Sequence, residues 1–112
     1  MTSGAELTID VSEKEGEVRL VVAGELDLSS VPRFEAALAL AEDGNPPVLD
    51  LELSELTFID STGLRAILQA SHRAESEGRS LVISNPSPTV RRLLAVTAMD
   101  HTIPIRQEDA AT

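Results

Sequence analysis

The sequence of 112 residues contains no cysteine, tryptophan or tyrosine, and its only aromatic residues are Phe34 and Phe58. A chain without cysteine forms neither disulfides nor thiolate metal sites, which is compatible with a reducing cytoplasm. Two histidines are too few for a transition-metal cluster. No segment has the length of a membrane span, and Met1 to Glu6 has neither the basic nor the apolar part of a secretion signal. We therefore expect a soluble, cytoplasmic protein with no metal ion or other cofactor.

Basic side chains are also scarce: nine Lys and Arg stand against 19 Asp and Glu, a formal net charge of −10. Binding to nucleic acid is not expected, because that affinity comes largely from Lys and Arg, and no membrane association is expected either. Residues 1–60 hold 14 acidic and three basic side chains. This asymmetry has two equally good explanations: an acidic surface that steers a basic protein partner, or selection for solubility.

The motifs of several enzyme classes are missing. A hydrolase nucleophile elbow around Ser61 needs a glycine two positions earlier, and position 59 is isoleucine. The sequence has no phosphate-binding glycine-rich loop ending in Lys-Ser/Thr and no Asp-rich calcium loop. His72 and His101 are better explained as surface residues than as general bases. We expect no catalytic residues and no enzymatic activity.

Hydrophobic periodicity predicts five strands and three helices. The second strand is apolar on both faces and should be central, while the third alternates Leu49, Leu51 and Leu53 with outward acids at 50 and 52. This solvated face indicates that helices mainly cover one side of the sheet. The expected strands are 7–12, 18–23, 48–53, 81–84 and 103–105, and the first two expected helices run from about Val31 to Ala41 and from about Ser61 to Glu77. Residues 85–88 are expected to form a loop and cap for a third helix through Val90, Leu93, Leu94 and Val96.

This element order predicts one α/β domain over residues 1–112, with residues 1–5 and 107–112 flexible. Its sheet should be mixed and four- to five-stranded, with an N-terminal β-hairpin and three or four helices mainly on one face. Parallel strands that are joined by helices place their carboxyl-terminal loops along one edge. Segments 25–28, 60–63 and 84–87 should therefore converge and form a binding edge.

The central segment is Phe58-Ile59-Asp60-Ser61-Thr62-Gly63-Leu64, where an apolar stretch meets the start of a helix. Asp60, Ser61 and Thr62 all belong to residue types that cap a helix N-terminus, so this segment is also explained as an ordinary strand-to-helix junction. Ser29 or Ser30 is the expected cap of the first helix, with Pro32 in its first turn. Gly78 is expected in a left-handed conformation after the second helix.

The segment from Phe58 to Leu64 resembles the signature of the STAS domain, which anti-sigma factor antagonists share with the tails of sulphate transporters. The segments Gly24-Glu25-Leu26-Asp27 and Ser87-Pro88-Thr89-Val90-Arg91-Arg92-Leu93-Leu94 match in the same order. The resemblance implies the STAS fold and a serine at position 61 that a partner kinase phosphorylates. The chain departs from the pattern at Thr97-Ala98-Met99, where Thr-Gly-Leu is usual, so the third helix is expected to run on or to be reshaped.

By resemblance, the chain is an anti-sigma factor antagonist. It would bind an anti-sigma factor with serine kinase activity, release the sigma factor, be inactivated at Ser61 and be reactivated by a serine phosphatase. Thr62 is the less favoured phosphoacceptor. We expect a monomer or weak homodimer. The partner-binding surface is expected to comprise Glu25, Asp27, Leu28, Ser29, Ile59, Asp60, Thr62, Gly63, Leu64, Arg65 and Asn85.

Several of these residues have a second explanation. Asp27 contacts the kinase or its nucleotide, or simply begins a helix. Leu28, Ile59 and Leu64 contact a partner or belong to the core. Arg65 pairs with a partner acid or is solvated, and the same solvated role is expected for Arg91 and Arg92. Gly63 is expected to let a partner approach, and both phenylalanines are expected in the core.

Three alternative functions remain for a STAS domain. The loop edge could hold a nucleotide or small anion, the chain could be an accessory subunit of a transport complex, or it could be a scaffold in a stress-signalling assembly. Direct nucleotide binding without a kinase would indicate the first alternative, and large homo-oligomers would indicate the last.

Overall fold

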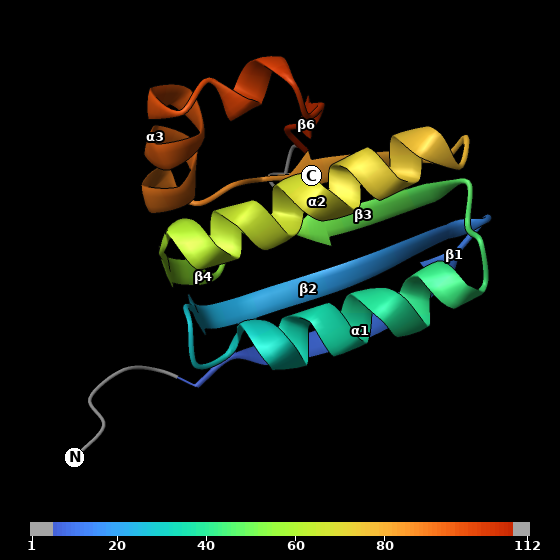
Figure 1. The fold of residues 1–112 in the computed structure, drawn as a ribbon, viewed down its shortest axis with the longest axis horizontal. Coiled ribbons are helices and arrows are strands. Elements are labelled where there is room, and N and C mark those ends of the chain that lie inside the picture. Colours follow the sequence, from blue (N-terminus) through green and yellow to red (C-terminus); the bar gives the residue numbers. More distant parts are fainter. Residues whose placement is uncertain (1–5, 109–112) are drawn as a thin grey trace.

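The computed structural model describes residues 6–108, so the predictions for residues 1–5 and 109–112 lie outside the described residues. Within this range the chain forms one mixed sheet of six strands with three α-helices and a short 3₁₀ helix (Figure 1). No helix of this range is long and apolar enough to cross a membrane. The elements are β1 (Thr8–Lys14), β2 (Glu17–Leu26), α1 (Val31–Asp43), β3 (Val48–Glu52), β4 (Leu56–Ile59), α2 (Ser61–Ser76), β5 (Ser80–Ser84), α3 (Pro88–Val96), η1 (Met99–His101) and β6 (Ile105–Arg106).

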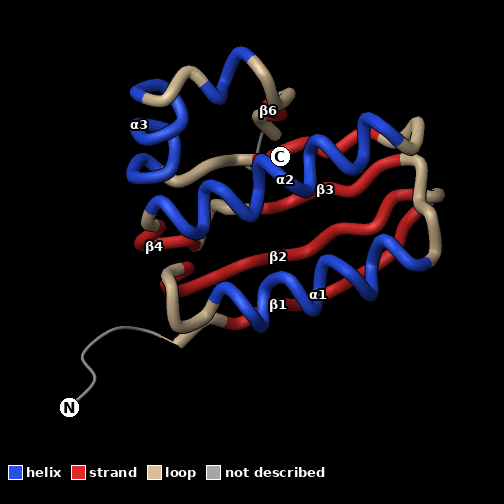
Figure 2. The backbone as a smooth tube through the Cα atoms, viewed as in Figure 1, coloured by secondary structure: helices blue, strands red, loops and turns tan. Residues whose placement is uncertain are grey.

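Strand β2 lies in the interior of the sheet, as predicted, and pairs with three other strands, β1, β3 and β4. The strand order is β1-β2-β3-β5-β6, and β4 pairs separately with β2 (Figure 2). The β1–β2 pair is antiparallel and all other pairs are parallel. The first half of β2, Glu17–Val21, pairs with β3, whereas its end pairs with β4 after a register shift between Gly24 and Glu25. The sheet therefore has one strand more than the four to five predicted, because the stretch before Asp60 forms a strand of its own.

One face of the sheet carries the hydrophobic core. Along β2 buried and half-buried residues alternate, which places every second side chain under the helices. Helices α1 and α2 lie side by side across this face, and α3 packs against β4 (Figure 1). Fully buried side chains from all these elements meet there: Leu20, Leu26, Phe34, Leu38, Leu49, Leu51, Leu56, Ile67, Ile83 and Leu94.

On the opposite face of the sheet the two acids of β3 are buried, which corrects the prediction that positions 50 and 52 are solvated. Asp50 is 0% exposed and Glu52 is 7% exposed. The Asp50 carboxylate accepts hydrogen bonds from Arg19 Nε at 3.0 Å and from Ser84 Oγ at 2.7 Å. Alternation with leucine placed these acids on the correct face, but cross-strand partners cover them. Buried carboxylates are tolerated because charged and hydroxyl donors satisfy them.

The segment after β6 closes part of this polar face. Arg19 Nη2 lies 2.6 Å from Glu108 Oε2, and the Glu108 backbone N–H donates to Asn85 Oδ1 at 2.8 Å. The guanidinium of Arg19 lowers the pKa of Glu108 below its usual value, although desolvation partly opposes this effect. Flexibility was predicted from residue 107 onward. Glu108, which belongs to that segment, contacts side chains of β2 and of the loop after β5.

Helix α3 ends at Val96 and does not run on. Ala98 adopts φ 61° and ψ 16°, a left-handed conformation, and η1 begins directly after it. Glycine adopts this conformation at little cost, whereas the Cβ of alanine makes it unfavourable. The chain therefore turns at Ala98, the position where the STAS pattern described above usually has glycine. Alanine is strained in this conformation.

Candidate functional site

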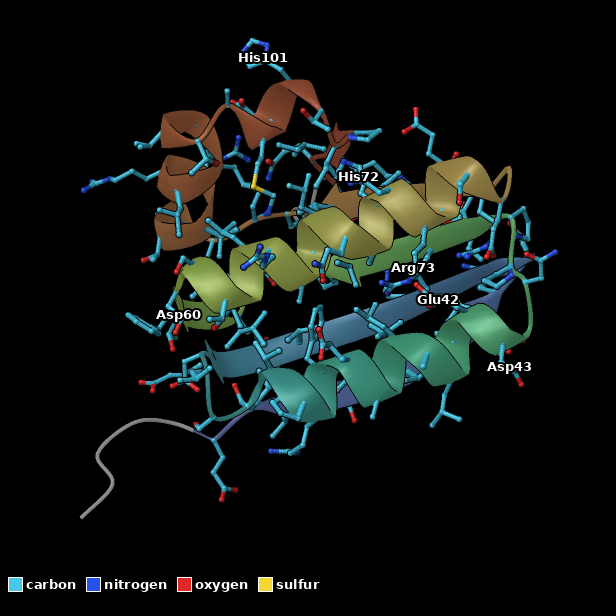
Figure 3. All side chains as sticks on the ribbon, viewed as in Figure 1. Glu42, Asp43, Asp60, His72, Arg73 and His101 are labelled. Atoms are coloured by element: carbon cyan, nitrogen blue, oxygen red, sulfur yellow. The ribbon has the colours of Figure 1, made fainter. Side chains whose placement is uncertain are left out.

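The site is built around the N-terminus of α2, where Asp60 is the N-cap (Figure 3). One carboxylate oxygen of Asp60 accepts from the backbone N–H groups of Thr62 and Gly63, both at 3.0 Å, and from Thr62 Oγ1 at 2.5 Å. These bonds satisfy two of the N–H groups that a helix leaves unpaired in its first turn. The capping role predicted for Asp60 is confirmed.

Asp60 also joins two loops that lie far apart in the sequence. Its second carboxylate oxygen accepts from the Leu28 N–H at 3.1 Å, and its own N–H donates to the Leu26 carbonyl at 3.2 Å. Partial desolvation raises the pKa of Asp60, but the bonds from Thr62, Gly63 and Leu28 together lower it below its usual value. The predicted convergence of the loop after β2 with the loop before α2 is thus present as direct hydrogen bonds.

Asp27 organises the loop between β2 and α1. Its Oδ1 accepts from the Ser29 hydroxyl at 2.8 Å and from the backbone N–H groups of Ser29 and Ser30 at 3.1 and 3.2 Å. The Ser29 hydroxyl is the main reason why the pKa of Asp27 lies below its usual value. Ser30 occupies the N-cap position of α1, but its hydroxyl donates to the Glu25 carbonyl instead of capping the helix. Asp27 therefore has a structural role at this helix entry, whatever else it contacts.

Ser61 and Thr62 differ in accessibility, although they are neighbours in the first turn of α2. Ser61 is exposed, and its hydroxyl forms no hydrogen bond to any other residue between 6 and 108. The Thr62 hydroxyl is half-buried and donates to Asp60. A reagent from solution reaches the Ser61 hydroxyl directly, whereas modification of Thr62 requires loss of a capping bond.

Gly63 is buried against other residues of the chain, and its contact with a partner stays a prediction. A Cβ at Gly63 would lie 2.9 Å from Ile59 Cγ1, 2.9 Å from Leu26 Cγ and 3.0 Å from the Leu26 carbonyl oxygen. Each distance is shorter than an ordinary van der Waals contact. Glycine at this position lets α2 approach the end of β2.

The apolar candidates divide into core and surface residues. Ile59 is 4% exposed and Leu64 is 7% exposed, so both belong mainly to the core. Leu28 is 72% exposed beside Asp60, as a partner contact requires. Phe58 is 45% exposed, which overturns its assignment to the core, while Phe34 is fully buried as predicted. No sequence signal identified Phe58, because the pairing of β4 after a register shift leaves both Thr57 and Phe58 exposed.

The third predicted loop joins the edge less directly. Ser87 caps α3 through the Val90 N–H, and its hydroxyl donates to the Leu56 carbonyl at 2.7 Å. Asn85 has φ 50°, and its amide donates to Glu52 Oε1 at 2.8 Å. The loop after β5 therefore contacts the β3–β4 connection, while Asn85 faces the polar side of the sheet.

The remaining polar candidates lie on the surface. His72 and His101 are both exposed and project from α2 and η1, away from Asp60 (Figure 3). Arg65 and Arg92 are exposed as predicted, and Arg91 donates to Gln107. No group of three or more His, Cys, Asp and Glu side chains that could hold a metal ion occurs between residues 6 and 108.

Comparison with known proteins gives a consistent result. Residues 5–107 match the family described as "Mlab, STAS domain". The anti-sigma-B factor antagonist of Bacillus subtilis is 31% identical over 100 residues, which cover 88% of this chain and 90% of that protein. The crystal structure of an anti-sigma factor antagonist from Mycobacterium paratuberculosis superimposes with a TM-score of 0.83, at 27% identity over 90% of this chain and 86% of that chain.

A Bacillus protein, the cell fate determinant SpoIIAA in its phosphorylated form, shares the fold with a TM-score of 0.73. It is 21% identical, and the match covers 92% of this chain and 93% of that one. The fold and the capped turn define a single-domain α/β protein with the accessible hydroxyl of Ser61 at the N-terminus of α2. The chain belongs to the STAS family.

Proposed function

We propose that this protein is an anti-sigma factor antagonist whose activity is switched by phosphorylation of Ser61. In its unphosphorylated form it binds an anti-sigma factor with serine kinase activity and thereby releases the sigma factor. The kinase phosphorylates Ser61, the complex dissociates, and a serine phosphatase restores the active form. This cycle takes place in the cytoplasm and involves no catalytic residue of the chain itself.

The observation that carries the proposal is the environment of Ser61. Its hydroxyl is exposed at the first position of α2, directly after the cap Asp60. Three hydrogen bonds hold the Asp60 carboxylate to the first turn of α2, and a fourth holds it to Leu28 in the loop after β2. The names of relatives similar over most of the chain support the same function. A kinase requires an accessible hydroxyl on a defined surface, and within the central segment Ser61 fits this requirement better than Thr62.

Phosphorylation at this position changes charge without requiring a new fold. A phosphoserine adds about −1.5 to −2 charges, and a helix N-terminus tolerates an anion because its N–H groups and dipole face it. At an interface the same charge near Asp60 and Asp27 repels a partner acid or leaves a buried charge unpaired, at a cost of several kcal/mol. Since about 1.4 kcal/mol corresponds to a tenfold change in affinity, one phosphate is sufficient to dissociate the complex.

The test is intact-mass analysis of the purified protein after incubation with ATP and purified candidate anti-sigma kinases from the same cell. The wild type is compared with Ser61→Ala and with Thr62→Ala, which keeps the favoured phosphoacceptor. We expect one added phosphate on the wild type and on Thr62→Ala, none on Ser61→Ala, and loss of the complex on a sizing column after phosphorylation.

Two results would contradict the proposal. If the chain binds a kinase but neither the wild type nor Ser61→Ala is phosphorylated, the protein is a constitutive binder or a scaffold. If it binds no candidate kinase, the antagonist function is wrong. In that case nucleotide titration of the isolated protein tests the ligand-module alternative.

A further inference from the structure

A groove of about 350 Å³ lies beside Ser61, between the first turns of α2 and the end of α3. Its inner wall is apolar: Leu64 is almost buried, Leu68 is half-buried, and Met99 is 8% exposed. The left-handed turn at Ala98 begins η1 at Met99 and so shapes the wall on the α3 side. The lining residues are Ser61, Thr62, Leu64, Arg65, Leu68, Thr97 and Met99.

The charge of this groove is unlike that of the whole chain. No carboxylate lines it, and Arg65 is its only charged residue, in a sequence with 19 acidic and nine basic side chains. Arg65 is exposed, and among residues 6–108 no ion pair or hydrogen bond occupies its guanidinium. A planar guanidinium without a partner is well suited to bind a carboxylate through two parallel hydrogen bonds.

Resting on the function proposed above, we infer that this groove receives one apolar side chain of the anti-sigma kinase, while a neighbouring carboxylate of the kinase pairs with Arg65. The groove is continuous with the exposed Ser61, so a kinase that reaches this hydroxyl also covers the groove. An apolar side chain inserted between Leu64, Leu68 and Met99 would be removed from water. Such buried anchors supply most of the binding energy of protein interfaces.

The same geometry explains how a phosphate on Ser61 would release the partner. Residues 61 and 65 are one helical turn apart, at the i and i+4 spacing at which opposite charges interact. A phosphate on Ser61 therefore pairs with Arg65 and competes with the partner's carboxylate. It also places a strongly hydrated dianion at the rim of an apolar groove, where docking would strip its water. Both effects weaken the complex, and neither requires the fold to change.

The inference is tested with two surface substitutions. Arg65→Glu reverses the charge at the groove, and Thr97→Trp fills the groove with an uncharged side chain. Each has a matched control on the same protein. Arg92→Glu makes the same charge change at an exposed position of α3 that does not line the groove. Leu40→Trp adds the same side chain to the hollow between β1 and α1, at the opposite end of the molecule (Figure 1).

Dissociation constants are measured against the purified anti-sigma kinase with ADP, so that no phosphate is transferred. We expect Arg65→Glu and Thr97→Trp to weaken binding by about tenfold or more, and both controls to remain within about threefold of the wild type. Thermal melts establish that all four variants are folded. If the wild type binds and both groove variants bind equally well, the groove inference is wrong while the antagonist function stands. If the wild type binds no kinase, both fail.

A second measurement tests the pairing of Arg65 with the phosphate. Phosphorus NMR follows the second ionisation of phosphoserine 61 in the wild type, in Arg65→Gln and in the control Arg92→Gln. An adjacent cation favours the dianion, so we expect the phosphate pKa to rise by about half a unit when Arg65 is removed and to change little in the control. An equal phosphate pKa in all three proteins would contradict the pairing.

Discussion

Replacing Asp60 tests whether one carboxylate both caps α2 and joins the two loops. Asp60→Ala removes all four hydrogen bonds that the side chain accepts. Loss of an N-cap costs about 0.5–2 kcal/mol, and loss of the bond to the Leu28 N–H costs about 0.5–1.5 kcal/mol. We expect a loss of about 1–3.5 kcal/mol in the free energy of unfolding. For a domain of this size, that corresponds to about 4 °C in melting temperature per kcal/mol.

Asp60→Asn separates the two roles. Asparagine retains one carbonyl oxygen and is as good a cap as aspartate, so the bonds to Thr62 and Gly63 survive. Its amide group, however, would face the Leu28 N–H, which is also a donor. We therefore expect Asp60→Asn to lose about 0.5–1.5 kcal/mol, from the bond between the loops alone.

Urea denaturation followed by circular dichroism, with Ser61→Ala as a control for an adjacent surface change, measures both variants. Two results would refute the reasoning. Equal losses for Asp60→Ala and Asp60→Asn would mean that the cap contributes nothing. If both variants are as stable as the wild type, the turn does not depend on Asp60 at all.

Three further predictions concern stability. Gly63→Ala brings a Cβ within 3.0 Å of Leu26 and Ile59. The crowding destabilises the fold by about 1–3 kcal/mol, whereas the higher helix propensity of alanine stabilises it by up to about 1 kcal/mol, so we expect a lower urea midpoint. Ala98→Gly removes a left-handed alanine and should raise the free energy of unfolding by about 0.5–1 kcal/mol, after the greater chain entropy of glycine is subtracted, and with it the melting temperature; an unchanged melting temperature would contradict the strain. Because the pKa of Asp60 is lowered in the folded state, its contribution is present above the unfolded pKa and is lost as the pH falls through the folded pKa. The urea midpoint should therefore fall as the pH is lowered from neutral to about pH 3, and it should fall less steeply for Asp60→Asn than for the wild type.

Much of the fold was predictable because local patterns determined it. The hairpin, the central position of β2 and the capping of α2 by Asp60 follow from periodicity and from capping chemistry within a few residues. The positions of the loops after β2 and before α2 followed from the topology of parallel strands. In the structure, hydrogen bonds between Asp60 and the backbone of Leu26 and Leu28 join these two loops.

The failures concern contacts between distant segments. The Asp50 carboxylate contacts Arg19, Ser84 and Arg106, which lie 31 to 56 positions away and carry no periodic signal toward it. Phe58 was placed in the core because it is aromatic, whereas it is 45% exposed in β4, where the pairing with β2 is irregular. Alternation along one strand reports the direction of a side chain but not what covers it.

The hydrogen bonds between Asp60 and the end of β2 also determine what an isolated peptide lacks. A peptide from Phe58 to Arg65 has the same sequence as the turn, but the Leu26 carbonyl and the Leu28 N–H that hold Asp60 lie 32 or more positions earlier in the chain. In an unfolded chain, Ser61 would therefore not be presented in this geometry. An enzyme that recognises the turn as it stands in the structure discriminates folded from unfolded copies, so modification of Ser61 would report on the integrity of the whole domain.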